Sequence, residues 1–299
     1  MNSGTPRTVQ RGIVTLLAAF CGVASALSQA IKPQHAQLSL ISTQVSGAPD
    51  TSKWIGLRFE LEPGWHIYWT NPGDSGEPPK VTWHLPEGVK AGDLQFPTPR
   101  RIRDHGLMDY GYEGQVVLLS KLTIPASSAS KKGEIGADVR YLACREVCVP
   151  GKAQLSLAPS SGDVKESAGL IESAEAKLPQ PLPRDVHVSA VSDKDSFVVT
   201  VADKRKILGT IRDFIPSDPQ SIDNVTMPVV QESAGLTHLR LKKSEQLHQS
   251  VSTLRGLLIA GDKAYNATIP VAASKTSSSK TGSNKTLFQK TQAYTKTKE

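Results

Sequence analysis

The sequence has few cysteines, with only Cys21, Cys144 and Cys148 among its 299 residues. Cys21 lies inside an apolar run near the N-terminus, where Phe20 occupies the position at which a lipoprotein signal would have a small residue. We therefore assign Cys21 to a leader that is removed, and we exclude a lipid attachment site. One possible cysteine pair remains in the mature chain.

The body of the chain also lacks an excess of charge of either sign. The whole sequence carries +7, but residues 1–30 contribute two positive charges through Arg7 and Arg11. Residues 273–299 contribute five more, since they hold six lysines and one glutamate. The remainder is neutral and has no electrostatic footprint of nucleic-acid binding, so we expect no nucleic-acid partner.

Long apolar runs are missing as well. Residues 13–27 are apolar, but the run is shorter than the roughly 20 residues of a membrane span and is interrupted by polar and small residues. With Arg7 and Arg11 before it and small residues after it, this run predicts a signal peptide and export to the periplasm. No stretch beyond Val271 is long and apolar enough to span a bilayer, so we expect no transmembrane segment in the mature chain. The two remaining cysteines are then exported to an oxidising compartment.

Short runs of alternating apolar residues recur along the rest of the chain, separated by Pro and Gly. They predict strands at 37–43, 54–61, 81–85, 116–124, 135–142, 153–157, 186–191, 196–201, 236–241, 254–259 and 265–271. Between the two groups of strands, residues 164–178 have helical spacing and end at Pro179. The pattern predicts an all-β protein of two β-sandwich domains, at 31–160 and 184–272, joined by a helical, Pro-rich linker at 161–183. Residues 273–299 are rich in Lys, Ser and Thr and are expected to be a disordered tail.

Aromatic residues make up only 5% of the sequence and are unevenly distributed. All four tryptophans and both mature cysteines lie in the first predicted domain, whereas the second has neither residue type. Because aromatic side chains ordinarily fill sandwich cores, most of this bias is explained by packing. The segment 141–151, YLACREVCVPG, is the part of the first domain that could carry chemistry.

Cys144 and Cys148 are separated by three residues at the end of a predicted strand. A disulfide between them would close a loop of about five residues, worth about 2 kcal/mol, compared with about 4.7 kcal/mol for a loop of about 100 residues. Such a disulfide would contribute little to the stability of the fold, but near a turn it is accessible to an attacking thiolate. Three interpretations stay open from the spacing: thiol-disulfide exchange, a structural disulfide, or binding of a soft metal such as copper together with His66, His105 or Met108.

Three blocks of sequence carry a resemblance to a known family. They are 63–79 (PGWHIYWTNPGDSGEPP), 110–114 (YGYEG) and 141–151. In this order and spacing they resemble the N-terminal periplasmic domain of the thiol:disulfide interchange protein DsbD family, and more narrowly its ScsB-like variant with a second β domain. A weaker similarity through 214–219, 222–224 and 254–260 extends the resemblance to about residue 271.

The resemblance implies an immunoglobulin-like fold in which Cys144 and Cys148 are the redox-active pair, with Cys148 facing the client protein. It also implies a cap loop that shields the cysteines, and it places His66 and Tyr68 beside them. The cap loop would consist of Leu107, Met108, Asp109, Tyr110 and Gly111. Tyr68 could equally be an ordinary core residue, and the cap an ordinary hairpin turn.

Family members continue into a membrane-spanning electron carrier and a thioredoxin-like domain, which are not found after Val271. The resemblance therefore implies a separate membrane thiol carrier as electron donor and oxidised periplasmic disulfide proteins as clients. Cytochrome c biogenesis is one process associated with such a relay. The expected activity is that of a protein-disulfide reductase component, with no cofactor and no metal. A non-catalytic adaptor with a structural disulfide and a copper-handling protein remain as alternatives.

Overall fold

The structure is a computed structural model that describes Met1 and residues 35–42, 53–125, 133–157 and 164–273. Apart from Met1, the predicted signal peptide lies outside the described residues, and so does the tail from residue 274 onward. The described residues from His35 to Ala273 belong to one compact unit.

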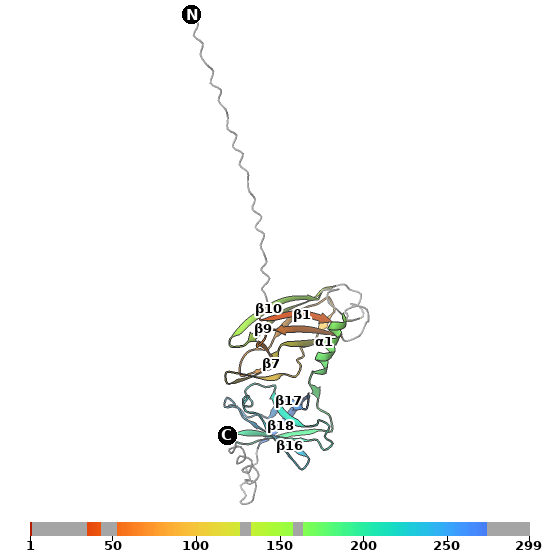
Figure 1. Ribbon diagram of the computed structural model, residues 1–299. Coiled ribbons are helices and arrows are strands. Elements are labelled where there is room, and N and C mark those ends of the chain that lie inside the picture. Colours follow the sequence, from red (N-terminus) through yellow and green to blue (C-terminus); the bar gives the residue numbers. More distant parts are fainter. Residues whose placement is uncertain (2–34, 43–52, 126–132, 158–163, 274–299) are drawn as a thin grey trace, which may run out of the picture. The chain divides into compact units, whose positions relative to one another are not determined.

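The described residues form strands β1 to β18 and a single helix, α1 (Figure 1). The all-β class predicted from the sequence is confirmed. In the first half of the chain the strands are β1 (Ala36–Ser42), β2 (Lys53–Leu61), β3 (His66–Gly73), β4 (Lys80–His84), β5 (Lys90–Ala91), β6 (Arg100–Asp104), β7 (Leu107–Glu113), β8 (Gln115–Thr123), β9 (Ile135–Cys144) and β10 (Cys148–Leu157). After α1 (Val164–Ala176) they are β11 (Gln180–Pro181), β12 (His187–Ser192), β13 (Ser196–Ala202), β14 (Ile211–Pro216), β15 (Val229–Ser233), β16 (Leu236–Lys242), β17 (Thr253–Ala260) and β18 (Lys263–Ala273).

Strands β1 to β10, which we call the first β domain, form two sheets around a shared core. One sheet has the order β1-β2-β8-β5, and the other has the order β10-β9-β3-β7-β6, with β4 also paired to β9. Since successive side chains of a strand point to opposite faces, every second residue of β2 and β8 enters the core. Leu57, Phe59 and Leu118 are fully buried in this way and pack with Tyr110 of the opposite sheet.

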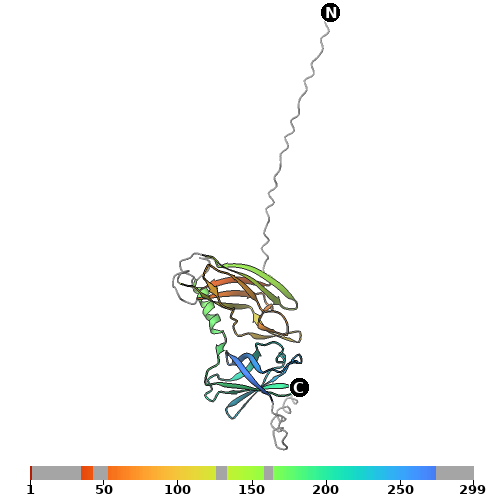
Figure 2. The same cartoon turned by 180° about the vertical axis from the view of Figure 1, so that it is seen from behind.

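Helix α1 packs against the outer face of the first sheet. The helix lies along this sheet in both views (Figures 1 and 2). Val117 and Leu119 of β8 point away from the core and are covered by Ile171 and Ala174 of the helix. This contact explains why β8 is buried on both faces. The helix predicted as a linker is therefore anchored on the first β domain.

Strands β11 to β18, which we call the second β domain, have a core of their own around Phe197, Phe214 and Leu258. Its strands follow the order β14-β17-β18-β12-β13-β16-β15, with β11 beside β18. Apolar residues on the other face of β14 and β17, including Ile215, Leu257 and Ile259, join the core cluster of the first domain. The two domains thus share a buried apolar contact.

Candidate functional site

The cysteine pair closes the tip of the hairpin formed by β9 and β10. Cys144 is the last residue of β9 and Cys148 the first of β10, and the two are direct partners in the antiparallel register. Their Cα atoms are 4.1 Å apart, and their sulfurs form a disulfide. The connecting residues Arg145, Glu146 and Val147 are exposed, and Val147 retains 65% of its accessible surface.

The two cysteines differ in their access to solvent. Cys144 is only 2% exposed, and it lies opposite the buried His66 in the sheet. Cys148 lies beyond the tip and is an exposed residue. An incoming thiolate must approach a sulfur along the S–S axis, so this asymmetry favours attack at Cys148 and leaves Cys144 as the internal sulfur.

His66 and Tyr68 lie beside the pair, on strand β3. His66 is the register partner of Cys144, and Tyr68, two residues later, points to the same face of the strand. The two rings are in edge contact with their centroids 5.1 Å apart. The Tyr68 hydroxyl lies 3.6 Å from Cys148 Sγ. A disulfide sulfur carries no proton, so the hydroxyl is the donor in this contact.

A short chain of hydrogen bonds continues from Tyr68 to a buried carboxylate. Asp109 accepts hydrogen bonds from the backbone N–H and the hydroxyl of Ser75, at 2.9 and 2.8 Å. The Ser75 hydroxyl lies 3.3 Å from that of Tyr68. Because the Ser75 proton is directed to Asp109, the Tyr68 hydroxyl can direct its own proton either to Ser75 or to Cys148 Sγ. Ser75 was not identified from the sequence, although it lies within the block at 63–79.

The Tyr68 hydroxyl stays protonated over the whole physiological range. Its side chain is fully buried, and burial, with a further contribution from the negative charge of Asp109, raises the pKa of Tyr68 to about 12. Tyr68 can therefore donate to a sulfur at any pH at which the protein would work.

His66 is the most unusual polar residue of the site. It is 2% exposed, and its Nε2 has no hydrogen-bond partner among the described residues. Asp109 Oδ2 lies 3.6 Å from that nitrogen, which is ion-pair distance if the imidazole is protonated. The other residues considered as soft-metal ligands lie apart from this group: Met108 is buried in the core, and the exposed His105 is paired with Asp104. Within the described ranges, no three His, Cys, Asp or Glu side chains gather into a group that could hold a metal ion.

The predicted cap loop, residues 107–111, is a strand. We refer to these five residues as the cap segment. They begin β7, which pairs with β6 on one side and β3 on the other, so their backbone groups are bonded within the sheet. Met108, Asp109 and Tyr110 are buried, and only Leu107 is exposed. Gly111 lies so close to the carbonyl of Ile67 that no Cβ would fit, so it permits tight strand pairing.

Gly76 determines where the Tyr68 ring can lie. It has a φ of +78°, and a Cβ at this position would enter the Tyr68 ring. We expect Gly76→Ala to lower the free energy of unfolding by more than the roughly 1–2 kcal/mol of left-handed backbone strain, since the ring must also move. Gly209→Ala is the matched control, because Gly209 has a φ of +77° with open space around it. Urea denaturation of the two variants measures the difference, and equal losses would show that the ring has room to move.

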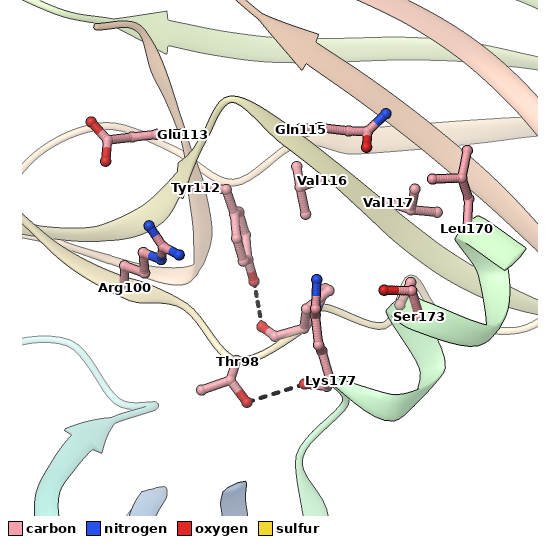
Figure 3. Close-up of a pocket in the computed structure, with 12 residues that line it drawn as sticks. Thr98, Arg100, Tyr112, Glu113, Gln115, Val116, Val117, Leu170, Ser173 and Lys177 are labelled. Carbon is pink, nitrogen blue, oxygen red and sulfur yellow. Dashed lines mark hydrogen bonds between the residues drawn. The ribbon is translucent and has the colours of Figure 1, made fainter. Parts of the chain in front are cut away.

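A pocket of about 220 Å³ lies elsewhere in the first domain, where α1 meets β8. Figure 3 shows Tyr112 pointing into this region, with its hydroxyl donating to the carbonyl of Pro97 at 2.6 Å. Thr98 donates to the carbonyl of Lys177 at the end of the helix. Neither cysteine lines the pocket, and its hydrogen bonds join Tyr112 of β7 and Lys177, just after the helix, to the segment at Pro97 and Thr98.

Comparisons with known proteins relate this chain to one family and to several solved structures. Residues 36–160 match the family model described as thiol:disulfide interchange protein DsbD, N-terminal. Among solved structures, the N-terminal periplasmic domain of ScsB from Proteus mirabilis has a TM-score of 0.58 and 17% sequence identity, and the match covers 79% of this chain and 94% of that one. The N-terminal domain of Neisseria meningitidis DsbD in the reduced form has a TM-score of 0.26 and 10% identity, covering 40% of this chain and 83% of that one. No curated protein matches.

The ScsB structure establishes a likeness of fold that extends beyond the first domain, and the family match covers the whole of that domain. The matched residues include all of the site: the β9–β10 hairpin with its disulfide, His66 and Tyr68, and the cap segment. Residues 36–160 of this chain belong to the family of N-terminal domains of the thiol:disulfide interchange protein DsbD.

Proposed function

We propose that this protein is a periplasmic thiol-disulfide exchange component that passes reducing equivalents through Cys144 and Cys148. The observation that carries the proposal is the hairpin tip, where the exposed Cys148 is bonded to the buried Cys144. A single sulfur is offered to a partner protein, and the other is retained to complete the reaction.

The exchange consists of two thiol-disulfide reactions. A thiolate of a reduced donor attacks Cys148 Sγ, the Cys144–Cys148 bond breaks, and Cys144 leaves as a thiolate that takes up a proton. The second thiol of the donor then displaces Cys148, so the donor becomes a disulfide and the pair becomes a dithiol. In the second reaction the Cys148 thiolate attacks a client disulfide, and Cys144 resolves the mixed disulfide. Two electrons and two protons pass from donor to client, and the Cys144–Cys148 bond is restored.

Tyr68 supports this cycle as a hydrogen-bond donor. In the disulfide state its hydroxyl lies between Ser75 Oγ and Cys148 Sγ. When Cys148 becomes a thiolate, the sulfur is the stronger acceptor, and donation from Tyr68 stabilises the charged form. In the same proposal the cap segment borders the site through Asp109, which accepts a hydrogen bond from Ser75 and lies 3.6 Å from His66 Nε2. Met108 and Tyr110 point into the core on the other face of the sheet.

The compartment and the partners are part of the proposal. The N-terminal leader pattern supports export, and the matched domain of Proteus mirabilis ScsB is periplasmic. In the part of the chain that the structure describes, no helix is long and apolar enough to cross a membrane. We propose a membrane thiol carrier as the donor and oxidised periplasmic disulfide proteins as the clients.

The reduction potential tests the function directly. We expect equilibration of the purified protein with glutathione or dithiothreitol buffers to give a potential within the range of oxidoreductases, about −120 to −270 mV. Mass spectrometry after acid quench and alkylation measures the dithiol fraction in each buffer. A potential below about −300 mV would assign the disulfide a structural role and overturn the proposal.

A further inference from the structure

Several side-chain hydrogen bonds join the second β domain to the cap segment and the residues beside it. The residues of this contact in the second domain are Asp213 and Asn224, which are 8% and 7% exposed. Two regions of the second domain, 214–219 and 222–224, carry the weaker family resemblance. Asp213 directly precedes the first region, and Asn224 is the last residue of the second. Neither residue takes part in the cysteine chemistry described above.

Arg101 of β6 anchors the contact. Its guanidinium donates to both carboxylate oxygens of Asp213, at 2.7 and 2.9 Å, and to the backbone carbonyl of Asn224 at 2.7 Å. The same guanidinium lies over the ring of Tyr110, 5.2 Å from its centroid. This forked geometry fixes the position of Asn224 relative to Tyr110.

The Asn224 side chain then bridges two segments of the first domain. Its Oδ1 accepts a hydrogen bond from the Tyr110 hydroxyl at 2.9 Å, and its Nδ2 donates to Asp74 Oδ1 at 2.7 Å. The other oxygen of Asp74 accepts from the backbone N–H of Met108 at 2.8 Å. Asn224 thus holds the cap segment directly through Tyr110 and indirectly through Asp74.

The same contact reaches the cysteines through the chain. Asp74 is followed by Ser75, which binds Asp109 of the cap segment and lies 3.3 Å from the Tyr68 hydroxyl. Tyr68 is in turn 3.6 Å from Cys148 Sγ. Every step from Asn224 to the exposed sulfur is therefore a hydrogen bond or a peptide bond.

We propose that the second β domain is a clamp on the cap segment and on the adjoining residues 74–76, and that Asn224 is the positioning residue through which it holds Ser75 and the Tyr68 hydroxyl beside Cys148. The inference rests on the proposed exchange function of the pair.

The side chains of Met108 and Tyr110 point into the core, on the other face of the sheet from Tyr68, so the clamp acts through Asp74. Holding Asp74 keeps Ser75 and Gly76 packed against Tyr68 beside Cys148, and releasing it opens this side of the site to small reagents and partners. Polar bonds suit this task, because the apolar contact of Ile215 and Leu257 with the first core keeps the domains joined when the bridge is broken.

The test compares Asn224→Ala with Asn266→Ala in the full chain. Asn266 is an exposed residue of the second domain, and its amide donates to the carbonyl of Pro179. For each variant we would measure the second-order rate of reduction of the disulfide by dithiothreitol, and the rate of alkylation of the reduced pair by iodoacetamide. We expect Asn224→Ala to raise both rates about thirtyfold, the change in an opening equilibrium produced by loss of its two side-chain hydrogen bonds. Asn266→Ala should leave both rates unchanged.

Tyr110→Phe provides a second test, because it removes one of the two bridged groups and keeps the ring in the core. It should raise the rates in the same direction by a smaller factor. Wild-type rates in Asn224→Ala, with or without a lower melting temperature, would show that Asn224 only stabilises the fold and would overturn the clamp. That result would leave the exchange function standing, since the exchange function is judged separately by the reduction potential of the wild-type pair.

Discussion

Cys144→Ala is expected to accumulate mixed disulfides with client proteins, whereas Cys148→Ala is expected to form almost none. In Cys144→Ala the exposed Cys148 can still attack a client, but the buried sulfur that would resolve the intermediate is missing. In Cys148→Ala the remaining thiol is at a residue that is 2% exposed, so it cannot reach a client disulfide. Non-reducing electrophoresis and mass spectrometry of acid-quenched periplasmic extracts would measure the adducts.

The variant lacking both cysteines is the control for adducts that do not involve the pair. Equal yields from the two single variants would contradict the assignment of Cys148 as the client-facing sulfur. Adducts at the level of the double variant in both would contradict the relay itself.

Arg101→Ala is expected to cause the largest loss of stability of any single substitution at the domain contact. The side chains of Arg101 and Asp213 are 11% and 12% exposed, so removing the guanidinium leaves a carboxylate buried without its partner. Breaking a buried pair in this way costs about 3–5 kcal/mol. Loss of the contact with the Tyr110 ring adds to this cost. Urea denaturation followed by tryptophan fluorescence is a suitable measurement, because all four tryptophans lie in the first domain.

Arg255→Ala is the matched control. Arg255 makes the same forked contact, with Asp218 of the second domain, but its side chain is 63% exposed. Water replaces such a partner readily, so we expect almost no change in stability. A similar small effect at both arginines would mean that the contact at Arg101 is open to solvent and does not hold the domains together.

Regular alternation made most strands predictable from the sequence. Residues 116–124 were predicted as a strand, and β8 occupies Gln115–Thr123; the second domain was predicted equally well at 196–201 and 236–241. These strands have the apolar period of a sheet that faces a core, and this period is a local property.

Strands β3 and β7 could not be found in this way. β3 contains Pro72 and Gly73, and β7 contains Asp109 and Gly111, which are residues typical of turns. Both become strands because they pair with each other, and the register between them shifts between Tyr68 and Gly73 to accommodate the irregular residues. Such pairing between segments about 40 residues apart outweighs local preference. Because the sequence reveals only the local preference, it predicts a loop for the cap segment.

The sequence by itself determined which residues can do redox chemistry. Only two cysteines follow the predicted leader, and their spacing, with the blocks around them, was sufficient to predict the family that the comparison confirmed. The tertiary structure alone decided that Cys148 is exposed and Cys144 buried, that the Tyr68 hydroxyl lies beside the outer sulfur, and that Asn224 contacts the cap segment. The physical reason is distance along the chain. Spacing within a hairpin is a local property, whereas burial and hydrogen bonding between Tyr68 and Cys148, or Tyr110 and Asn224, depend on how sheets pack across 80 to 114 residues of sequence.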